Sequence, residues 1–302
     1  MDAAAVVRRL ETLTDAALRS RWVRYAGWVL GLAGLAFLAR SLVQARDAGM
    51  GWFTAVTPST LLLACAAFAL YQAGSIVTLR LLYQRPVLTI WGISQLVKYL
   101  PLPGSAAVGM VGSAVRGGGS TRDGVTLTLR HTLVHVGAAT AVGSPAVAAT
   151  LGEVTPLPAW PVVVAGCLAG LGVILLGLRN LSLATAASVS VLTVVMWAGL
   201  GGLLWAGVAL GAGDPVRVAT AFAAAWVAGQ IALPVPAGLG VREAVLLVLL
   251  APVLGDVAAL SFALGTRVLH VASDAVVAAW VGGRSGWGLL RRAATVAFRD
   301  EP

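Results

Sequence analysis

The chain has 302 residues, of which 59% are hydrophobic and only 11% are charged, and its formal net charge is +9. Soluble domains carry about 25% charged residues, so this composition excludes an ordinary soluble globular protein. The basic residues stand at the ends of apolar runs and form no single patch, which argues against a nucleic-acid-binding protein. A membrane span takes roughly 20 apolar residues, so the length accommodates about six to eight spans. We therefore expect an all-α, polytopic integral membrane protein.

Residues 1–21 predict an amphipathic helix on the membrane surface, because apolar residues recur at helical spacing while charged residues such as Arg8 and Glu11 occupy the other face. Two later apolar runs, 87–116 and 217–255, are interrupted near the middle by proline and glycine. Six uninterrupted runs predict complete spans, at residues 22–43, 59–79, 124–150, 159–178, 183–210 and 257–281.

The arginines predict the orientation of these spans. With the N-terminus inside, the inner segments hold fourteen arginines and the outer segments hold only Arg40, Arg46 and Arg217. Cytoplasmic loops of membrane proteins carry such an excess of basic residues, so both termini are expected in the cytoplasm.

Cysteine and tryptophan residues give simpler expectations. Cys65 and Cys167 lie inside apolar runs, where we expect small buried side chains and no disulfide framework. Several tryptophans, among them Trp91 and Trp160, fall near predicted membrane interfaces, as in an aromatic belt.

The two interrupted runs contain matching motifs. The first reads QLVKYLPLPG from Gln95 to Gly104, and the second reads QIALPVPAG from Gln230 to Gly238. Two prolines within three residues end a helix, and the backbone freed at membrane depth persists only where protein or a water-filled cavity covers it. Both runs therefore predict re-entrant helical hairpins, although full crossing by the second pair stays open. The residues that break the helices are Pro101, Pro103, Gly104, Pro234, Pro236, Gly238 and Gly240.

The order of elements predicts an internal repeat within a single membrane domain of residues 1–302. Residues 22–150 run span, span, hairpin, span, and residues 159–282 repeat this order, followed by a basic cytoplasmic tail of residues 283–302. Three full spans in each half place the halves in opposite orientations. Inverted repeats with broken helices are a recurring transporter architecture.

The segment LPVPAGLGVREA, from Leu233 to Ala244, resembles the signature of the lysylphosphatidylglycerol synthase transmembrane region family, also called the flippase-like domain. The segment ALGTR ending at Arg267 and the first interrupted motif also look similar to it. The resemblance implies a bacterial inner (plasma) membrane protein that moves a lipid or a lipid-linked molecule between leaflets. Since only residues 283–302 follow the last predicted span, we expect no C-terminal synthase domain.

Charged residues inside apolar runs are the candidate substrate-binding residues. A charge at the bilayer centre costs about 2.5–3.5 kcal/mol, so it indicates function by default, with a structural salt bridge or snorkelling as the alternative. Arg242 begins a helical arm, where free N–H groups and the guanidinium favour a lipid phosphate, and Glu243 is expected to pair with an arginine or to cap that arm. Arg267 and Asp274 share one helix face, as a functional stripe or a structural pair. The full set is Lys98, Arg130, Arg242, Glu243, Arg267 and Asp274.

Three histidines are candidates for a proton relay: His131 and His135 at i, i+4 spacing, and His270 between Arg267 and Asp274. Two histidines are too few ligands for zinc, so we expect no metal and no cofactor. The expected partners are membrane lipids with an anionic headgroup and no nucleic acid, and a homo-oligomer stays open.

The leading hypothesis is a flippase or transporter, without enzyme activity, for an anionic or lipid-linked substrate of the phospholipid or polyprenyl-phosphate type. The first alternative is a membrane-embedded transferase that uses a lipid-phosphate donor. Such an enzyme needs a carboxylate base or metal-binding acids, and here the outer loops are short and Asp47 is isolated. The second alternative is a non-transporting scaffold or regulator of envelope enzymes, which nothing in the sequence excludes.

Overall fold

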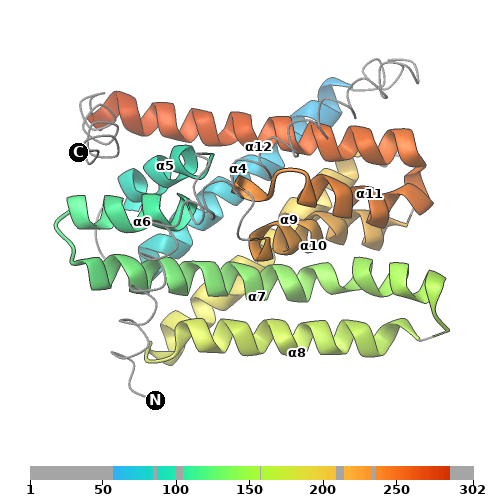
Figure 1. Ribbon diagram of the computed structural model, residues 1–302, viewed down its shortest axis with the longest axis horizontal. Coiled ribbons are helices and arrows are strands. Elements are labelled where there is room, and N and C mark those ends of the chain that lie inside the picture. Colours follow the sequence, from blue (N-terminus) through green and yellow to red (C-terminus); the bar gives the residue numbers. More distant parts are fainter. Residues whose placement is uncertain are drawn as a thin grey trace, which may run out of the picture.

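The computed structural model describes residues 57–83, 87–99, 105–156, 158–208, 214–232 and 236–285. Every regular element in these ranges is helical, so the all-α prediction is confirmed for this part of the chain (Figure 1). The predicted surface helix, the predicted span 22–43, residues 286–302 of the tail, and the breaking residues Pro101, Pro103, Gly104 and Pro234 lie outside the described residues. The elements are α4 (Pro58–Leu82), α5 (Val87–Val97), α6 (Ser105–Arg116), α7 (Thr121–Val154), α8 (Ala159–Leu178), α9 (Leu183–Val208), α10 (Pro215–Ile231), the 3-10 turn η1 (Pro236–Gly238), α11 (Val241–Leu254) and α12 (Asp256–Ser285).

Five helices are long and apolar enough to cross a membrane, namely α4, α7, α8, α9 and α12. Each corresponds to one predicted run, and α8 begins and ends where the sequence predicts, at residues 159 and 178. Helix α7 begins three residues earlier than predicted because Ser120 and Asp123 form a capping box, in which each side chain accepts a hydrogen bond from the other residue's backbone N–H. These helices indicate a membrane protein.

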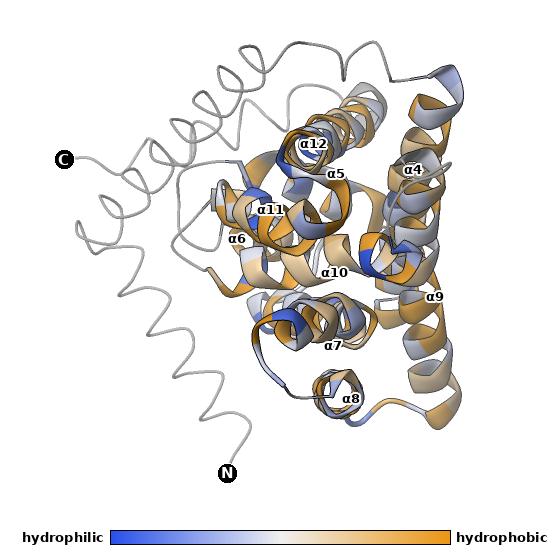
Figure 2. Ribbon diagram, turned by 90° about the vertical axis from the view of Figure 1, so that its right-hand side faces the viewer, coloured by the Kyte–Doolittle hydropathy of each residue, from blue (hydrophilic) through white to orange (hydrophobic). Residues whose placement is uncertain are grey.

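Apolar side chains cover the outside of the long helices. Leu168 and Leu175 on α8 are 65% and 59% exposed, and Figure 2 shows hydrophobic residues along α9 at the edge of the molecule. The prediction that both cysteines are buried is wrong, because Cys65 on α4 and Cys167 on α8 are exposed. A helix surrounded by hydrocarbon can turn apolar residues outward, since lipid tails are as apolar as a protein core.

The two interrupted runs form two pairs of shorter helices. Helices α5 and α6 pack against each other, and so do α10 and α11. Helices α5 and α6 have 11 and 12 residues. That is about 17–18 Å of helix, less than the ~30 Å hydrocarbon core of a bilayer. In Figure 1, α5 and α6 lie toward the end of the molecule where α12 ends, whereas α10 and α11 lie toward the end where α12 begins.

The turn between α10 and α11 reverses through left-handed backbone conformations. Ala237, Gly238 and Gly240 have φ angles of 51°, 65° and 81°. A Cβ atom on Gly238 would lie 2.7 Å from the Cα atom of Gly229 on α10, so the turn is pressed against that helix. This close approach fixes where α11 starts, and α11 carries Arg242 and Glu243.

Candidate functional site

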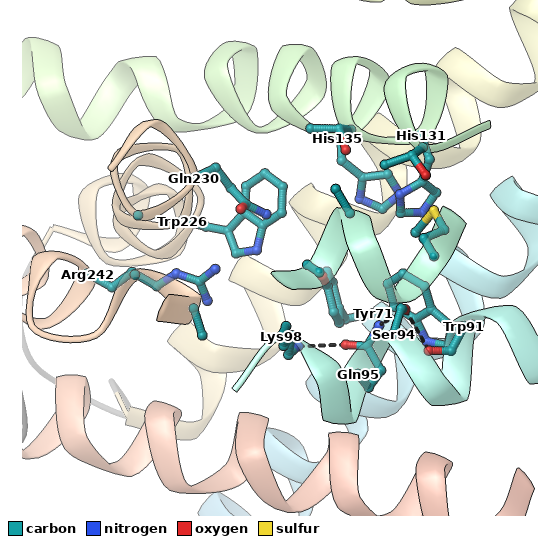
Figure 3. Close-up of a pocket in the computed structure, with 18 of the residues that line it drawn as sticks. Tyr71, Trp91, Ser94, Gln95, Lys98, His131, His135, Trp226, Gln230 and Arg242 are labelled. Carbon is teal, nitrogen blue, oxygen red and sulfur yellow. Dashed lines mark hydrogen bonds between the residues drawn. The ribbon is translucent and has the colours of Figure 1, made fainter. Parts of the chain in front are cut away.

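A cavity of about 130 Å³ lies where the two interrupted segments meet helix α7 (Figure 3). The first segment contributes Gln95 and Lys98 to its wall, and the second contributes Gln230 and Arg242. Gln95 and Gln230 are the glutamines at the start of the two matching motifs. The structure thus brings the glutamine upstream of each proline interruption to one space.

Arg242 enters the cavity from the first turn of α11. The carboxylate of Glu243 accepts a hydrogen bond of 2.8 Å from the Gly240 N–H, which closes the start of α11. The Arg242 guanidinium lies over the Trp226 ring, 5.8 Å from its centroid, in cation–π geometry. Arg242 is only 9% exposed, and its Nε atom is buried without a hydrogen-bond partner among the described residues. A buried, incompletely bonded cation is suited to receive an anion.

Room for the Arg242 side chain comes from α10. A Cβ atom on Gly229 would lie 2.6 Å from Arg242 Cγ and 2.7 Å from Arg242 Nε. Any larger residue at position 229 would therefore collide with this arginine. Sequence reasoning missed Gly229, because a glycine inside an apolar helical run looks like an ordinary packing residue.

Glu243 and Arg267 hold the turn that precedes α11. Glu243 is 1% exposed, and its Oε1 atom lies 3.7 Å from Arg267 Nε. Arg267 Nη1 donates a hydrogen bond of 3.1 Å to the Ala237 carbonyl. Glu243 therefore both caps the helix and pairs with an arginine. Neither residue is in the cavity wall, so both act on the site through the position of Arg242.

Asp274 lies at the centre of a second polar network, between α12, α4 and the end of α5. It is fully buried, and its carboxylate accepts hydrogen bonds from Gln72 Nε2 at 2.8 Å and from the Tyr99 hydroxyl. Lys98 Nζ lies 2.7 Å from Asp274 Oδ2 and donates to Gln95 Oε1 at 2.6 Å. Arg267 and Asp274 share one face of α12, but each has its own partner.

The charges of these two networks do not cancel. Lys98, Arg242 and Arg267 supply three positive charges, and Glu243 and Asp274 supply two negative charges. With the histidines neutral, one positive charge is in excess. Asp274 pairs with Lys98 and Glu243 with Arg267, so Arg242 is the cation that forms no ion pair of its own among the described residues.

The three candidate histidines take two different places. His131 and His135 line the cavity from α7 with ring centroids 4.2 Å apart. Their buried atoms His131 Nε2, His135 Nδ1 and His135 Nε2 have no hydrogen-bond partner among the described residues. His270 lies against Tyr71, with ring centroids 5.3 Å apart, and is not in the cavity wall. Its Nε2 atom is 3.9 Å from Asp274 Oδ2, too far for a hydrogen bond.

Arg130 is partly buried on α7 and is not part of the cavity wall. The expectation for Trp91 as an interface residue is wrong. Trp91 is 3% exposed, its Nε1 atom donates to Gln72 Oε1 at 2.7 Å, and its ring lines the cavity. The hydropathy of the chain gave no signal for this, because a tryptophan near the end of an apolar run suits an interface equally well.

Arg217 was assigned to an outer segment, yet it is only 2% exposed. Its guanidinium forms an ion pair with the Glu153 carboxylate, which includes a hydrogen bond of 3.1 Å from Nη2. The guanidinium also donates from Nη2 to the Thr150 hydroxyl at 3.0 Å and from Nε to the Leu249 carbonyl at 2.6 Å. This cluster joins the end of α7 to α10 and α11, away from the cavity.

Within the described residues, no group of three or more histidine, cysteine or acidic side chains is placed to hold a metal ion. No protein-family model matches the chain, and a comparison with curated proteins gave no match. The family named from the motifs therefore remains a prediction.

Proposed function

We propose that the chain is a membrane transporter of the flippase type, which moves a lipid with an anionic, phosphate-containing headgroup between the two leaflets. The observation that carries the proposal is Arg242, a buried cation with no ion pair and an unpartnered Nε atom among the described residues, in a cavity shared by both interrupted segments. A charge in such a place is retained at a cost and indicates a substrate path. The resemblance to the flippase-like domain family agrees with this proposal.

The arrangement of the helices supports a re-entrant, inverted topology. Helices α5 and α6 are too short to cross a bilayer. Helices α10 and α11 lie toward the opposite end of the molecule (Figure 1), and residues of both pairs line the cavity. Arg80, Arg122 and Arg179 are exposed near the end of α4, the start of α7 and the end of α8. These helix ends lie at one end of the molecule, which we assign to the cytoplasm with both termini, in the plasma membrane.

In this proposal the lipid headgroup leaves one leaflet, binds in the cavity and leaves toward the other leaflet while its tails stay in hydrocarbon. The phosphate binds the Arg242 guanidinium, and the positive end of the α11 dipole adds to the attraction. A second, apolar hollow of about 580 Å³ lies between α7, α8 and α10, and α7 and α10 also line the cavity. Its wall includes Val147, Ala165 and Val227, and it suits an acyl chain.

The composition of the cavity wall favours transport over the transferase alternative. Among the described residues that line the cavity, none is acidic, so none is a carboxylate base for a transfer reaction. Binding without covalent change needs only the cation and the hydrogen-bonding groups that are present.

The test is reconstitution of the purified full chain into liposomes that contain tail-labelled phosphatidylglycerol or a labelled isoprenoid phospholipid. A membrane-impermeant reductant destroys label in the outer leaflet, so the labelled fraction that becomes accessible over time measures leaflet exchange. We expect exchange well above protein-free liposomes, loss of that exchange in Arg242→Gln, and wild-type exchange in Arg179→Gln, which removes an exposed arginine far from the cavity.

Exchange no faster than in protein-free liposomes would refute transport. Wild-type exchange in folded Arg242→Gln would refute the role of this arginine. A new lipid product in the extracted liposomes would support the transferase, whereas neither exchange nor product would support the scaffold.

A further inference from the structure

We infer that the cavity binds a headgroup in which one phosphodiester is joined to a neutral polyhydroxyl group, such as a glycerol or a single sugar ring. The inference rests on the proposed function, since it names the headgroup of the transported lipid. It draws on the charge of the site, the chemistry of the cavity wall and the size of the space.

The charge of the site specifies a monoanion. Among the described residues of the site, Lys98 pairs with Asp274 and Arg267 with Glu243, which leaves one positive charge in excess and Arg242 without an ion pair of its own. Buried charges are tolerated when they are paired, so one negative charge completes the site. A phosphodiester carries one negative charge. A phosphomonoester carries about −1.5 to −2 at pH 7 and would leave unmatched negative charge.

The same wall disfavours a headgroup that ends in an ammonium. Lys98 and Arg242 repel a cation, and no acidic residue is among the described residues that line the cavity. Asp274 is fully buried among Gln72, Lys98 and Tyr99. The linking segments 100–104 and 233–235 contain no aspartate or glutamate in the sequence.

The unpaired polar atoms of the wall match hydroxyl groups. A neutral imidazole has one donor and one acceptor nitrogen, and a hydroxyl is likewise both donor and acceptor. His135 is 1% exposed with both ring nitrogens unpartnered among the described residues, and His131 is 6% exposed with Nε2 unpartnered. Figure 3 shows these two rings on α7, across the cavity from Arg242. A polyhydroxyl group beside the bound phosphate satisfies them.

The size of the space limits the headgroup. An apolar cavity of roughly 150 Å³ engineered in another protein holds one benzene ring. The cavity of about 130 Å³ is therefore suited to a glycerol or one sugar ring. The rings of Tyr71, Trp91 and Trp226 give it flat apolar walls.

The test is competitive lipid retention by the detergent-solubilised full chain, measured by native mass spectrometry. The mixture contains four lipids with identical acyl chains: phosphatidylglycerol, phosphatidylethanolamine, phosphatidic acid and a glucosyl diacylglycerol. We expect the protein to retain phosphatidylglycerol at least roughly three- to tenfold more than each of the other lipids, because each of them lacks one good hydrogen bond or charge contact with the site. A parallel measurement uses glucosyl-phosphoryl polyprenol, which carries the same headgroup chemistry on an isoprenoid tail. Whichever of this lipid and phosphatidylglycerol is retained more tightly identifies the class of lipid that the cavity binds.

The variant His135→Phe removes both unpartnered nitrogens at similar size, and its preference for phosphatidylglycerol over phosphatidic acid should fall by roughly three- to tenfold. The matched control His270→Phe changes a buried histidine outside the cavity wall and should keep the preference. The retention of phosphatidylglycerol relative to the other lipids is measured on the wild-type chain, so it tests the inference even if His135→Phe fails to fold.

Equal or stronger retention of phosphatidylethanolamine or phosphatidic acid would overturn the inference. Selective retention of phosphatidylglycerol without leaflet exchange in liposomes would refute transport alone. Exchange of phosphatidylethanolamine as fast as phosphatidylglycerol, with no preference in retention, would refute the headgroup and leave transport standing.

Discussion

Gly229 allows a test of Arg242 that leaves its charge in place. A Cβ atom at position 229 would lie 2.6 Å from Arg242 Cγ, closer than real Cβ atoms come to other heavy atoms. Helix α10 has little room to retreat, because its backbone at Gly229 is pressed against Gly238 of the turn. In Gly229→Ala the Arg242 side chain must therefore rotate away from its position over Trp226.

The expected effect on stability is small, whereas the effect on binding is large. Replacing a helical glycine with alanine stabilises a helix by about 0.8–1 kcal/mol, and overpacking costs about 1–3 kcal/mol, so the net loss is about 0–2 kcal/mol. Hydrogen bonds from a guanidinium to a phosphate contribute about 1.5–3 kcal/mol. Losing them should slow leaflet exchange of an anionic lipid by roughly tenfold to a hundredfold.

The assay is leaflet exchange in liposomes together with thermal melting in detergent, at equal reconstitution. The matched control is Gly172→Ala on α8, where an added Cβ atom meets no other atom within 4 Å. The control should exchange lipid at the wild-type rate. If folded Gly229→Ala also exchanges lipid at the wild-type rate, the position of Arg242 does not matter for transport and the reasoning is refuted.

Further predictions follow from the other networks. Asp274→Asn removes the counter-charge of a buried lysine and should destabilise the fold by about 3 kcal/mol in detergent unfolding; an unchanged unfolding free energy would contradict this. Arg217→Met removes the hydrogen bonds of a buried guanidinium to the Leu249 carbonyl and the Thr150 hydroxyl and should cost about 2 kcal/mol in the same measurement. Ala237→Gly relieves the left-handed φ of 51°, so it should increase the unfolding free energy by about 1 kcal/mol and raise the melting temperature. In a cysteine-free background, an impermeant thiol reagent should label Gly152→Cys in intact cells and Arg179→Cys only after permeabilisation, and the reverse result would invert the topology.

The positions of the long helices could be predicted from the sequence, and for α8 the ends could be predicted as well. All hydrogen bonds of an α-helix are local, and the thickness of the bilayer sets the length of an apolar run, so a one-dimensional pattern is sufficient. The run 159–178 is the clearest case, since α8 has those same bounds. The interruptions were also visible: α5 ends at Val97, shortly before Pro101, because proline cannot continue a helix.

Whether a side chain faces lipid or the protein interior could not be predicted from the sequence. Hydrophobic residues point toward lipid as readily as toward protein, so the pattern does not distinguish the exposed Cys65 and Cys167 from the buried Trp91. The charged residues themselves were identified as candidates, but not all of them belong to one site. Arg242 and Lys98 line the cavity, whereas Arg130 does not.

Contacts between residues far apart in the sequence were visible only in the tertiary structure. Asp274 accepts a hydrogen bond from Tyr99, 175 residues away in the chain, and Arg217 pairs with Glu153, 64 residues away. A buried charge must be neutralised by whichever groups the packing brings near, and local sequence carries no information about them. Composition and periodicity therefore specified the helices and the breaks, while the packing of the helices left Arg242 as the cation with no ion pair among the described residues of the site.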